Sequence, residues 1–104
     1  METVILHSEA TVAPEHRDDA VEILTWMAAQ SRAEDGVVDY RVTSDLEAPN
    51  TFRIVEQYED VAAVEAHESS DHLDEFQARI GPLLVGEPRL TRYDVTAVTE
   101  MDGP

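Results

Sequence analysis

One carboxylate in the sequence stands in a setting that could give it acid–base chemistry. Glu56 lies in the segment 51–60, whose alternating pattern predicts a strand, and it shares a strand face with two large apolar residues and Tyr58. An apolar setting disfavours the ionised carboxylate and raises its pKa, which suits a general acid or base. The same pattern also fits a structural role, in which Glu56 bonds a backbone group or an arginine such as Arg53 or Arg92.

Two histidines follow in the segment AHESSDH. His67 stands at helical spacing from Val64, so it can face the sheet and take a proton near neutral pH. A half-buried His67 bonded to a backbone carbonyl is an equally good interpretation. His72 lies four residues beyond Glu68, and we expect it to be exposed and paired with that carboxylate or, if the chain has a substrate pocket, to bind the substrate.

A metal site is not expected from these histidines. His67 and His72 are five residues apart, which separates them by about 140° around one continuous helix. Only a helix break at Ser69–Ser70 would change this. His7 and Glu9 share a strand face without other ligand types beside them, and the chain has no cysteine. The sequence therefore predicts neither a metal ion nor another cofactor.

Aromatic residues could form a pocket for a flat ring between a sheet and its helices. The set consists of Trp26, Tyr40, Phe52, Tyr58, Phe76 and Tyr93. Ordinary core packing is the commoner role for so few aromatic side chains. The sequence contains no glycine-rich phosphate loop and no serine nucleophile motif, so nucleotide cofactors are not expected.

The elements that must position these residues follow from hydrophobic periodicity and turn signals. The pattern predicts a strand at 3–12, a helix from Pro14 to a stop at Gly36, and a hairpin of strands at 37–45 and 51–60. It then predicts a helix that Asp60 caps, that restarts at Ser69–Ser70 and that ends at Gly81–Pro82, and a last strand within 89–99 after a turn at 86–88.

This order predicts an α+β fold of the ferredoxin-like β-α-β-β-α-β type, with an antiparallel sheet and both helices on one face. The whole chain, 1–104, is expected to be a single domain with a core at about 3–98 and a flexible tail at 100–104. Several strands carry apolar residues on both faces, so the open face of the sheet is expected to pack on a second copy. The sequence therefore predicts a homodimer, a dimeric α/β barrel.

The charge balance excludes several kinds of partner. Seven arginines stand against 23 acidic residues, so the net charge is 7 − 23 = −16, and lysine is absent. Nucleic acid and anionic membranes both require basic patches, so neither is expected as a partner. An acidic, lysine-free composition indicates a halophilic protein whose surface repulsion is screened by salt. With no apolar run of membrane-spanning length and no basic signal region at the start, we expect a cytoplasmic protein.

The chain resembles the antibiotic biosynthesis monooxygenase family. The resemblance covers about residues 3–98, and three pieces carry most of it: the acidic turn SRAEDG, the Glu56-x-Tyr58 strand end and AHESSDH. The family more often has Trp where this chain has Tyr58. It implies a dimeric α+β barrel and includes cofactor-free oxygenases of phenols and quinols. Haem-degrading members carry a histidine where this chain has Gln77 and a Trp where it has His67, which argues against haem.

The resemblance and the residues together predict a cofactor-independent monooxygenase acting on a small phenolic or quinol substrate. Glu56 and His67 would move protons. The remaining candidates would bind the substrate, namely Tyr40, Tyr58, Trp26, Phe76 and His72. One alternative is a non-catalytic dimeric protein that binds small molecules or acts in a stress response. Another is an isomerase of aldehyde-like or phosphosugar-like substrates, for which the only strand arginines are Arg41, Arg53 and Arg92.

Overall fold

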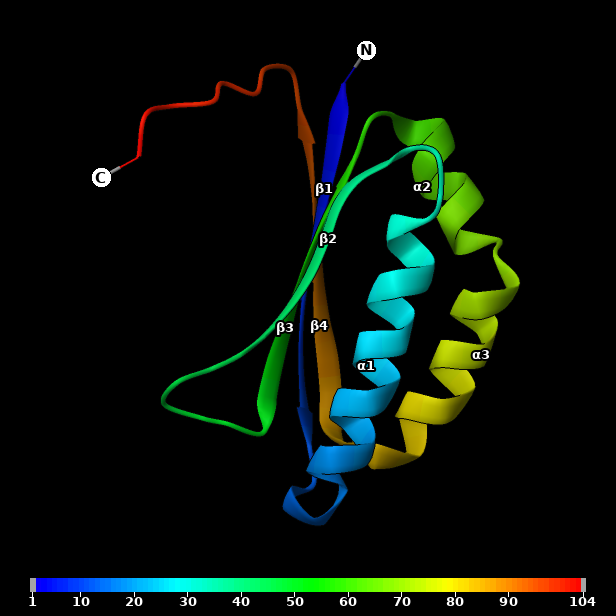
Figure 1. Ribbon diagram of the computed structural model, residues 1–104, viewed down its shortest axis with the longest axis vertical. Helices are drawn as coiled ribbons and strands as arrows, with labels where there is room; N and C mark the ends of the chain where they lie inside the picture. The colour runs from blue at the N-terminus through cyan, green and yellow to red at the C-terminus, as the bar shows by residue number, and fades with distance from the viewer. Residues whose placement is uncertain (1, 104) are drawn as a thin grey trace.

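The computed structural model describes residues 2–103 and confirms the predicted order of elements. In chain order they are β1 (Thr3–Val12), a 3₁₀ turn (Pro14–His16), α1 (Arg17–Arg32), β2 (Val37–Ser44), β3 (Thr51–Tyr58), α2 (Val61–Glu68), α3 (Asp71–Ile80), a 3₁₀ turn (Gly81–Leu83) and β4 (Leu84–Val95). The sheet is antiparallel, and Figure 1 shows the helices together on one side of it. The fold is therefore the α+β, ferredoxin-like one.

The strand order places Glu56 in the interior of the sheet. The order is β2-β3-β1-β4, so β3 and β1 are the central strands. Glu56 lies opposite Leu6 of β1 on one side and Tyr40 of β2 on the other. Because side chains alternate along a strand, all three point to the helix-covered face. A carboxylate thus stands among buried side chains at the centre of the layer.

The last strand begins earlier than predicted. We expected it within 89–99 after a turn at 86–88, whereas β4 runs from Leu84 to Val95. The segment 86–88 is a bulge within β4, because the pairing with β1 shifts register there and Gly86 has a φ of 72°. A positive φ is typical of glycine in bulges as well as in turns. Gly86 therefore marked an irregularity of the backbone correctly, but the irregularity is a bulge within a strand and not a turn before it.

Helix α1 packs on the sheet through an apolar stripe of the predicted spacing. Its buried residues are Ala20, Ile23, Leu24, Met27, Ala28 and Ser31. All of them except Ser31 join apolar residues of the sheet, such as Phe52 and Ile54, in the larger of two core clusters. The smaller cluster consists of Val4, Leu6, Tyr58 and Val64 and lies under α2. The candidate site lies where these two clusters meet.

The second helical segment is broken, as the serine pair indicated. Helix α2 ends at Glu68 and α3 begins at Asp71. The Ser70 hydroxyl accepts a hydrogen bond from the Leu73 amide and caps α3, and it also lies 2.7 Å from the His67 carbonyl oxygen, to which it donates. Asp60 caps α2 in the same way by accepting from the Ala63 amide. The break is thus held by defined side-chain bonds.

The face of the sheet away from the helices has no covering element in the described residues (Figure 1). Val55 and Tyr93, on either side of β1, are 43% and 49% exposed there. Residues 96–103 leave the sheet on this side without regular structure, and Pro104 of the predicted tail lies outside the described residues.

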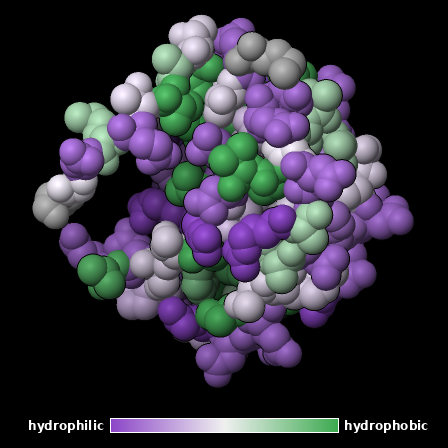
Figure 2. All heavy atoms as spheres, turned by 45° about the horizontal axis from the view of Figure 1, so that its top comes forward, coloured by the Kyte–Doolittle hydropathy of each residue, from purple (hydrophilic) through white to green (hydrophobic). Residues whose placement is uncertain are grey.

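Hydrophilic side chains dominate the face of the molecule seen in Figure 2. Within residues 2–103 no helix has the length and apolar character needed to cross a membrane.

Candidate active site

Glu56 is buried, with 6% of its surface exposed, and has a defined partner. The Tyr58 hydroxyl donates to Glu56 Oε1 over 2.5 Å. Burial raises the pKa of Glu56, while the bond from Tyr58 and the nearby His67 oppose that rise. The two arginines considered as partners bond elsewhere, because Arg53 pairs with Asp45 and Glu9, and Arg92 pairs with Asp94. Glu56 is therefore a buried carboxylate with a phenol partner and no arginine partner.

His67, in the last turn of α2, is also buried and lies next to Glu56. Its Nε2 atom is 3.7 Å from Glu56 Oε1, and its Nδ1 atom is 2.9 Å from Oε2 of Glu34. The imidazole lies near two phenol rings, with centroid distances of 5.9 Å to Tyr40 and 5.4 Å to Tyr58. The expected alternative, a bond to a backbone carbonyl, is not its main interaction. His67 instead connects two carboxylates.

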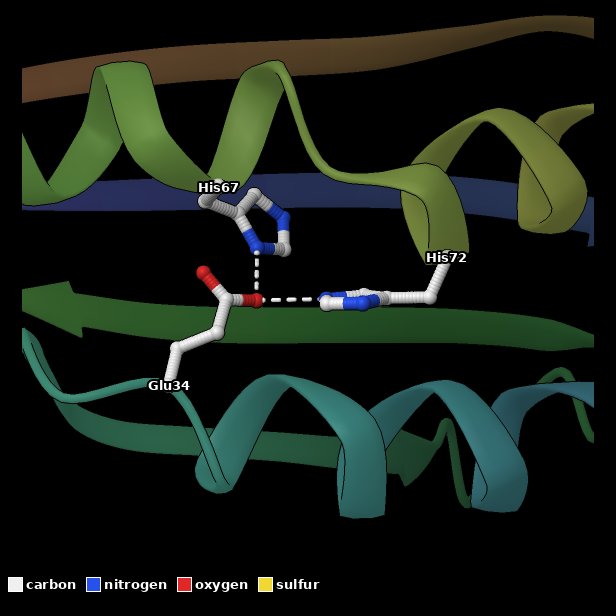
Figure 3. A group of neighbouring side chains, drawn as sticks. All are labelled: Glu34, His67 and His72. Carbon is white, nitrogen blue, oxygen red and sulfur yellow. Dashed lines mark hydrogen bonds and ion pairs between the residues drawn. The ribbon is translucent and has the colours of Figure 1, made fainter.

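Glu34 belongs to the candidate site and was not predicted from the sequence. It lies between α1 and β2, and its Oε2 atom accepts from His67 and from His72, whose Nε2 atom is 2.6 Å away. Figure 3 shows both imidazoles converging on this one oxygen. The prediction that His72 is exposed and pairs with Glu68 is wrong, because the helix break turns His72 toward Glu34 and partly buries it. The available signal for Glu34 was its place in the acidic turn SRAEDG.

Two local features bring these residues together. The break at Ser69–Ser70 removes the angular separation that His67 and His72 would have on one helix, so the argument against a shared site fails. Gly36 lets the segment after α1 approach α2, because a Cβ atom there would overlap the Ala63 side chain. Glu34 can therefore reach the end of α2.

A cavity of about 640 Å³ lies between the sheet and α3, and Glu56, His67 and Tyr40 are in its wall. Its volume is in the range of about 300–1,000 Å³ found for small-molecule sites. The lining comes from all four strands, all three helices and the 3₁₀ turn before β4. Most of it is apolar, and the large or aliphatic members include Leu6, Ala10, Val12, Leu24, Phe52, Ile54, Leu73, Phe76, Ile80, Leu84 and Leu90. The cavity thus offers an apolar volume with a few buried polar groups.

The other predicted substrate contacts divide into two groups. Tyr40 and Phe76 line the cavity, as does Gln77. Tyr58 and Trp26 are not among the lining residues: Tyr58 is buried and bonds Glu56, and the Trp26 ring lies under the Arg79 guanidinium, 5.3 Å from it. Burial and the nearby Glu56 raise the pKa of both Tyr40 and Tyr58, so both phenols stay protonated near neutral pH and keep an O–H group that can donate.

The arginines required by the isomerase alternative are not at the cavity. Arg41, Arg53 and Arg92 are absent from its lining, and each forms an ion pair with a neighbouring carboxylate. Arg89 does line the cavity, but its side chain is 82% exposed. An anionic substrate group would therefore find no buried arginine among the lining residues.

Comparison with known proteins agrees with this arrangement. The sequence model described as "Antibiotic biosynthesis monooxygenase" matches residues 3–79. A Bacillus subtilis protein named "Putative monooxygenase YcnE" is 30% identical over 93 residues, which are 89% of this chain and 98% of that protein.

Solved structures show the same fold. A Deinococcus radiodurans protein, named as a "putative antibiotic biosynthesis monooxygenase", has 25% identity and a TM-score of 0.89 over 96% of this chain and 99% of that chain. A Pseudomonas aeruginosa protein has 28% identity and a TM-score of 0.83 over 93% and 97% of the two chains. With most of its length matched, this chain belongs to the antibiotic biosynthesis monooxygenase family.

Proposed function

We propose that this protein is a monooxygenase that acts on a small phenolic or quinol substrate without a redox cofactor. The observation that carries the proposal is the pair formed by His67 and Glu56, 3.7 Å apart in the wall of a largely apolar cavity. Burial of two titratable groups is costly for a fold unless they are used or well bonded. The names of the family and of its relatives support oxygenation as the reaction class.

The first step that this geometry supports is proton removal from the substrate hydroxyl. His67 donates its Nδ1 proton to Glu34, which leaves the lone pair of Nε2 free to accept a proton on the cavity side. Glu56 lies next to that nitrogen and stabilises the imidazolium once it forms. Tyr58 holds the Glu56 carboxylate from the other side. Glu34 is thus a positioning residue for His67.

Molecular oxygen then reacts with the electron-rich phenolate. The anion transfers one electron to O₂, and the two radicals combine as a peroxide at a ring carbon that carries hydrogen. Removal of that hydrogen as a proton breaks the O–O bond, so one oxygen atom stays as the product carbonyl and the other leaves as water. A phenol plus O₂ thus gives a quinone plus water, and the protein supplies a base and an apolar site.

Oxygen uptake by the chelator-treated protein with a panel of phenols and quinols tests this function. We expect uptake without added flavin, haem or metal. Glu56→Gln and His67→Ala should each slow it by roughly 10²-fold or more, because each removes a group that handles protons. The matched controls are Glu65→Gln and His16→Ala, which change the same residue types at exposed or partly exposed positions away from the cavity lining.

The outcomes separate the proposal from its main alternative. Full activity in both site variants would remove Glu56 and His67 from the mechanism. Binding of the panel without oxygen uptake would instead support a non-catalytic small-molecule-binding or stress-response protein. Thermal melts of every variant show whether a loss of activity is only a loss of fold.

We also propose that the protein is a homodimer formed through the open sheet face. Ile5 lies beside Tyr93, and Val55 lies on the next strand opposite His7, so a second copy would cover apolar residues of three strands. Sedimentation equilibrium should show a dimer that Val55→Glu dissociates. Val61→Glu, on α2 in the helix layer, is the matched control and should leave the dimer intact. A monomeric parent protein would contradict this interface.

The acidic composition also supports a proposal about the cellular location and the salt concentration in which the protein works. We propose a cytoplasmic protein of a high-salt organism, since 16 uncompensated negative charges repel one another at low ionic strength. The Debye length falls from roughly 30 Å at 0.01 M salt to roughly 3 Å at 1 M. The melting temperature should therefore rise steadily over that range. A flat or falling melting temperature would contradict the adaptation to salt.

A further inference from the structure

The cluster of Glu34, His67 and His72 has the composition of a metal site. Each residue offers one ligand atom, and these atoms lie within 4.8 Å of one another. They come from three separate segments: the turn after α1, the end of α2 and the start of α3 (Figure 3). Two imidazole nitrogens and one carboxylate oxygen are a ligand set typical of zinc and other first-row transition metals, and not of magnesium or calcium.

We propose that this cluster binds one divalent transition-metal ion, with zinc as the reference ion. The ligands would be His67 Nδ1, His72 Nε2 and a Glu34 carboxylate oxygen, with water completing a tetrahedral site. At present Oε2 of Glu34 is hydrogen-bonded to His67 Nδ1 at 2.9 Å and to His72 Nε2 at 2.6 Å. In a tetrahedral zinc site the ligand atoms are about 3.3 Å apart, given bonds of about 2.0 Å. Both nitrogen–oxygen distances therefore have to lengthen by less than 1 Å, and the two imidazole nitrogens, which lie within 4.8 Å of each other, have to adjust to the same spacing.

A second observation points the same way. When Nδ1 of an imidazole binds a metal, the ring proton must sit on Nε2, and this N–H usually donates to a carboxylate that orients the ring. For His67 the carboxylate on that side is Glu56, whose Oε1 atom is 3.7 Å from Nε2; this is longer than a hydrogen bond, so the two groups have to move closer for the bond to form. Tyr58 fixes Glu56 in turn. The chain therefore holds a ligand set together with an outer carboxylate for its most buried ligand.

The site is also reachable and electrostatically suited to a cation. The His72 and Glu34 side chains are 21% and 17% exposed, so an ion can enter from their side while His67 closes the inner side. The net charge of −16 raises the local concentration of cations around the whole molecule. Because the same charge also attracts ions non-specifically, the test must separate this cluster from surface carboxylates.

Isothermal titration with Zn²⁺ in excess Mg²⁺, on the full chain, makes that separation. We expect one zinc per chain, and at least tenfold weaker binding in Glu34→Gln and in His72→Ala. His16→Ala is the matched control, since it removes a histidine outside the cluster, and it should bind zinc like the parent. Titration with Co²⁺ should also produce visible absorption bands of a tetrahedral site in the parent protein that are missing in His72→Ala.

Three results would overturn the proposal: no saturable binding with one ion per chain, equal binding in the parent and His72→Ala, or an adventitious ion only, displaced by Mg²⁺. The metal site does not rest on the proposed function, because binding is measured without a substrate and oxygen uptake with a chelator. Bound zinc would leave His67 no free lone pair, so it should inhibit the oxygen uptake proposed above. Binding without any oxygenase activity would leave the metal site standing and remove the oxygenase.

Discussion

Helix α1 and the broken pair α2–α3 cover the same face of one sheet but do so differently. The buried residues of α1 form an apolar stripe completed by one serine, and they pack directly on the strands. In α2 and α3 only Val64, His67 and Ile80 are buried, and the main neighbours of α3 in the described chain are α1 and the turn at 81–83. The cavity lies in the space that α3 leaves above the sheet.

This difference coincides with the place of the candidate site. A continuous apolar helix stabilises the sheet, whereas a capped break allows two histidines to turn inward and meet carboxylates from other segments. Buried polar groups of this kind cost stability unless each is bonded. We therefore expect substitutions in α1 to change mainly the free energy of unfolding and substitutions around the break to change mainly activity and ion binding.

The largest effect on stability is expected in α1. Met27 is fully buried in the larger core cluster, so Met27→Ala should lower the free energy of unfolding by about 2–5 kcal/mol. Urea unfolding measures this loss, and activity per folded molecule should be unchanged. The comparison variant is His72→Ala, which should cost less than about 1 kcal/mol because its partly exposed ion pair contributes little. Equal losses of unfolding free energy in Met27→Ala and His72→Ala would contradict the difference described between α1 and the pair α2–α3.

The next effect concerns the pH dependence of activity. The Tyr58 hydroxyl lowers the pKa of Glu56, so Tyr58→Phe should raise that pKa further. Glu56 assists in its ionised form, and activity should fall as pH falls through its pKa. The acid limb of the oxygen-uptake profile should therefore move to higher pH in the variant, with a loss of about 1.5 kcal/mol in stability.

The phenylalanine substitution has a matched control at the same sheet. Tyr93→Phe removes a hydroxyl from an exposed tyrosine on the open face and should leave the profile unchanged. An acid limb that stays in place in Tyr58→Phe would show that Glu56 does not set the protonation state needed for activity.

The smallest effect compares the two helix caps. Ser70→Ala and Asp60→Ala each remove one capping bond, and each should cost about 1 kcal/mol. Only Ser70 also bonds the His67 carbonyl oxygen and holds the break. Ser70→Ala should therefore weaken zinc binding and slow oxygen uptake more than Asp60→Ala does. Equal effects of the two variants on zinc binding and on oxygen uptake would show that the helix break does not position the site residues.

The fold was predictable from the sequence because most elements carry local signals. Alternating patterns identified the strands, Pro14 marked the turn that leads into α1, and Asp60 marked the start of α2. The predicted stop at Gly36 was too late, because α1 already ends at Arg32. The start of β4 was misplaced because glycine and proline at 86–88 indicate a turn and a bulge equally well. A choice between them depends on the pairing with β1, which is a tertiary property.

The site was predictable only in part. The burial of Glu56 was predictable because it shares a face with apolar neighbours on one strand, which is a local pattern. Glu34 was missed because its role depends on the approach of the turn after α1 to α2, across Gly36 and Ala63. The partner of His72 was wrong for the same reason: a helix break can be predicted locally, but the direction of the side chain beyond it is set by packing.

The central claim is that His67 and Glu56 ionise a phenol inside the cavity, and the most direct measurement is the ionisation state of a bound phenol. Nitrophenols report it by absorbance and are too electron-poor to reduce O₂. At a pH below the pKa of the free probe, we predict that the parent protein binds it with the phenolate absorption band and that His67→Ala and Glu56→Gln bind it as the neutral phenol. A probe bound to the parent protein only as the neutral phenol would contradict the account.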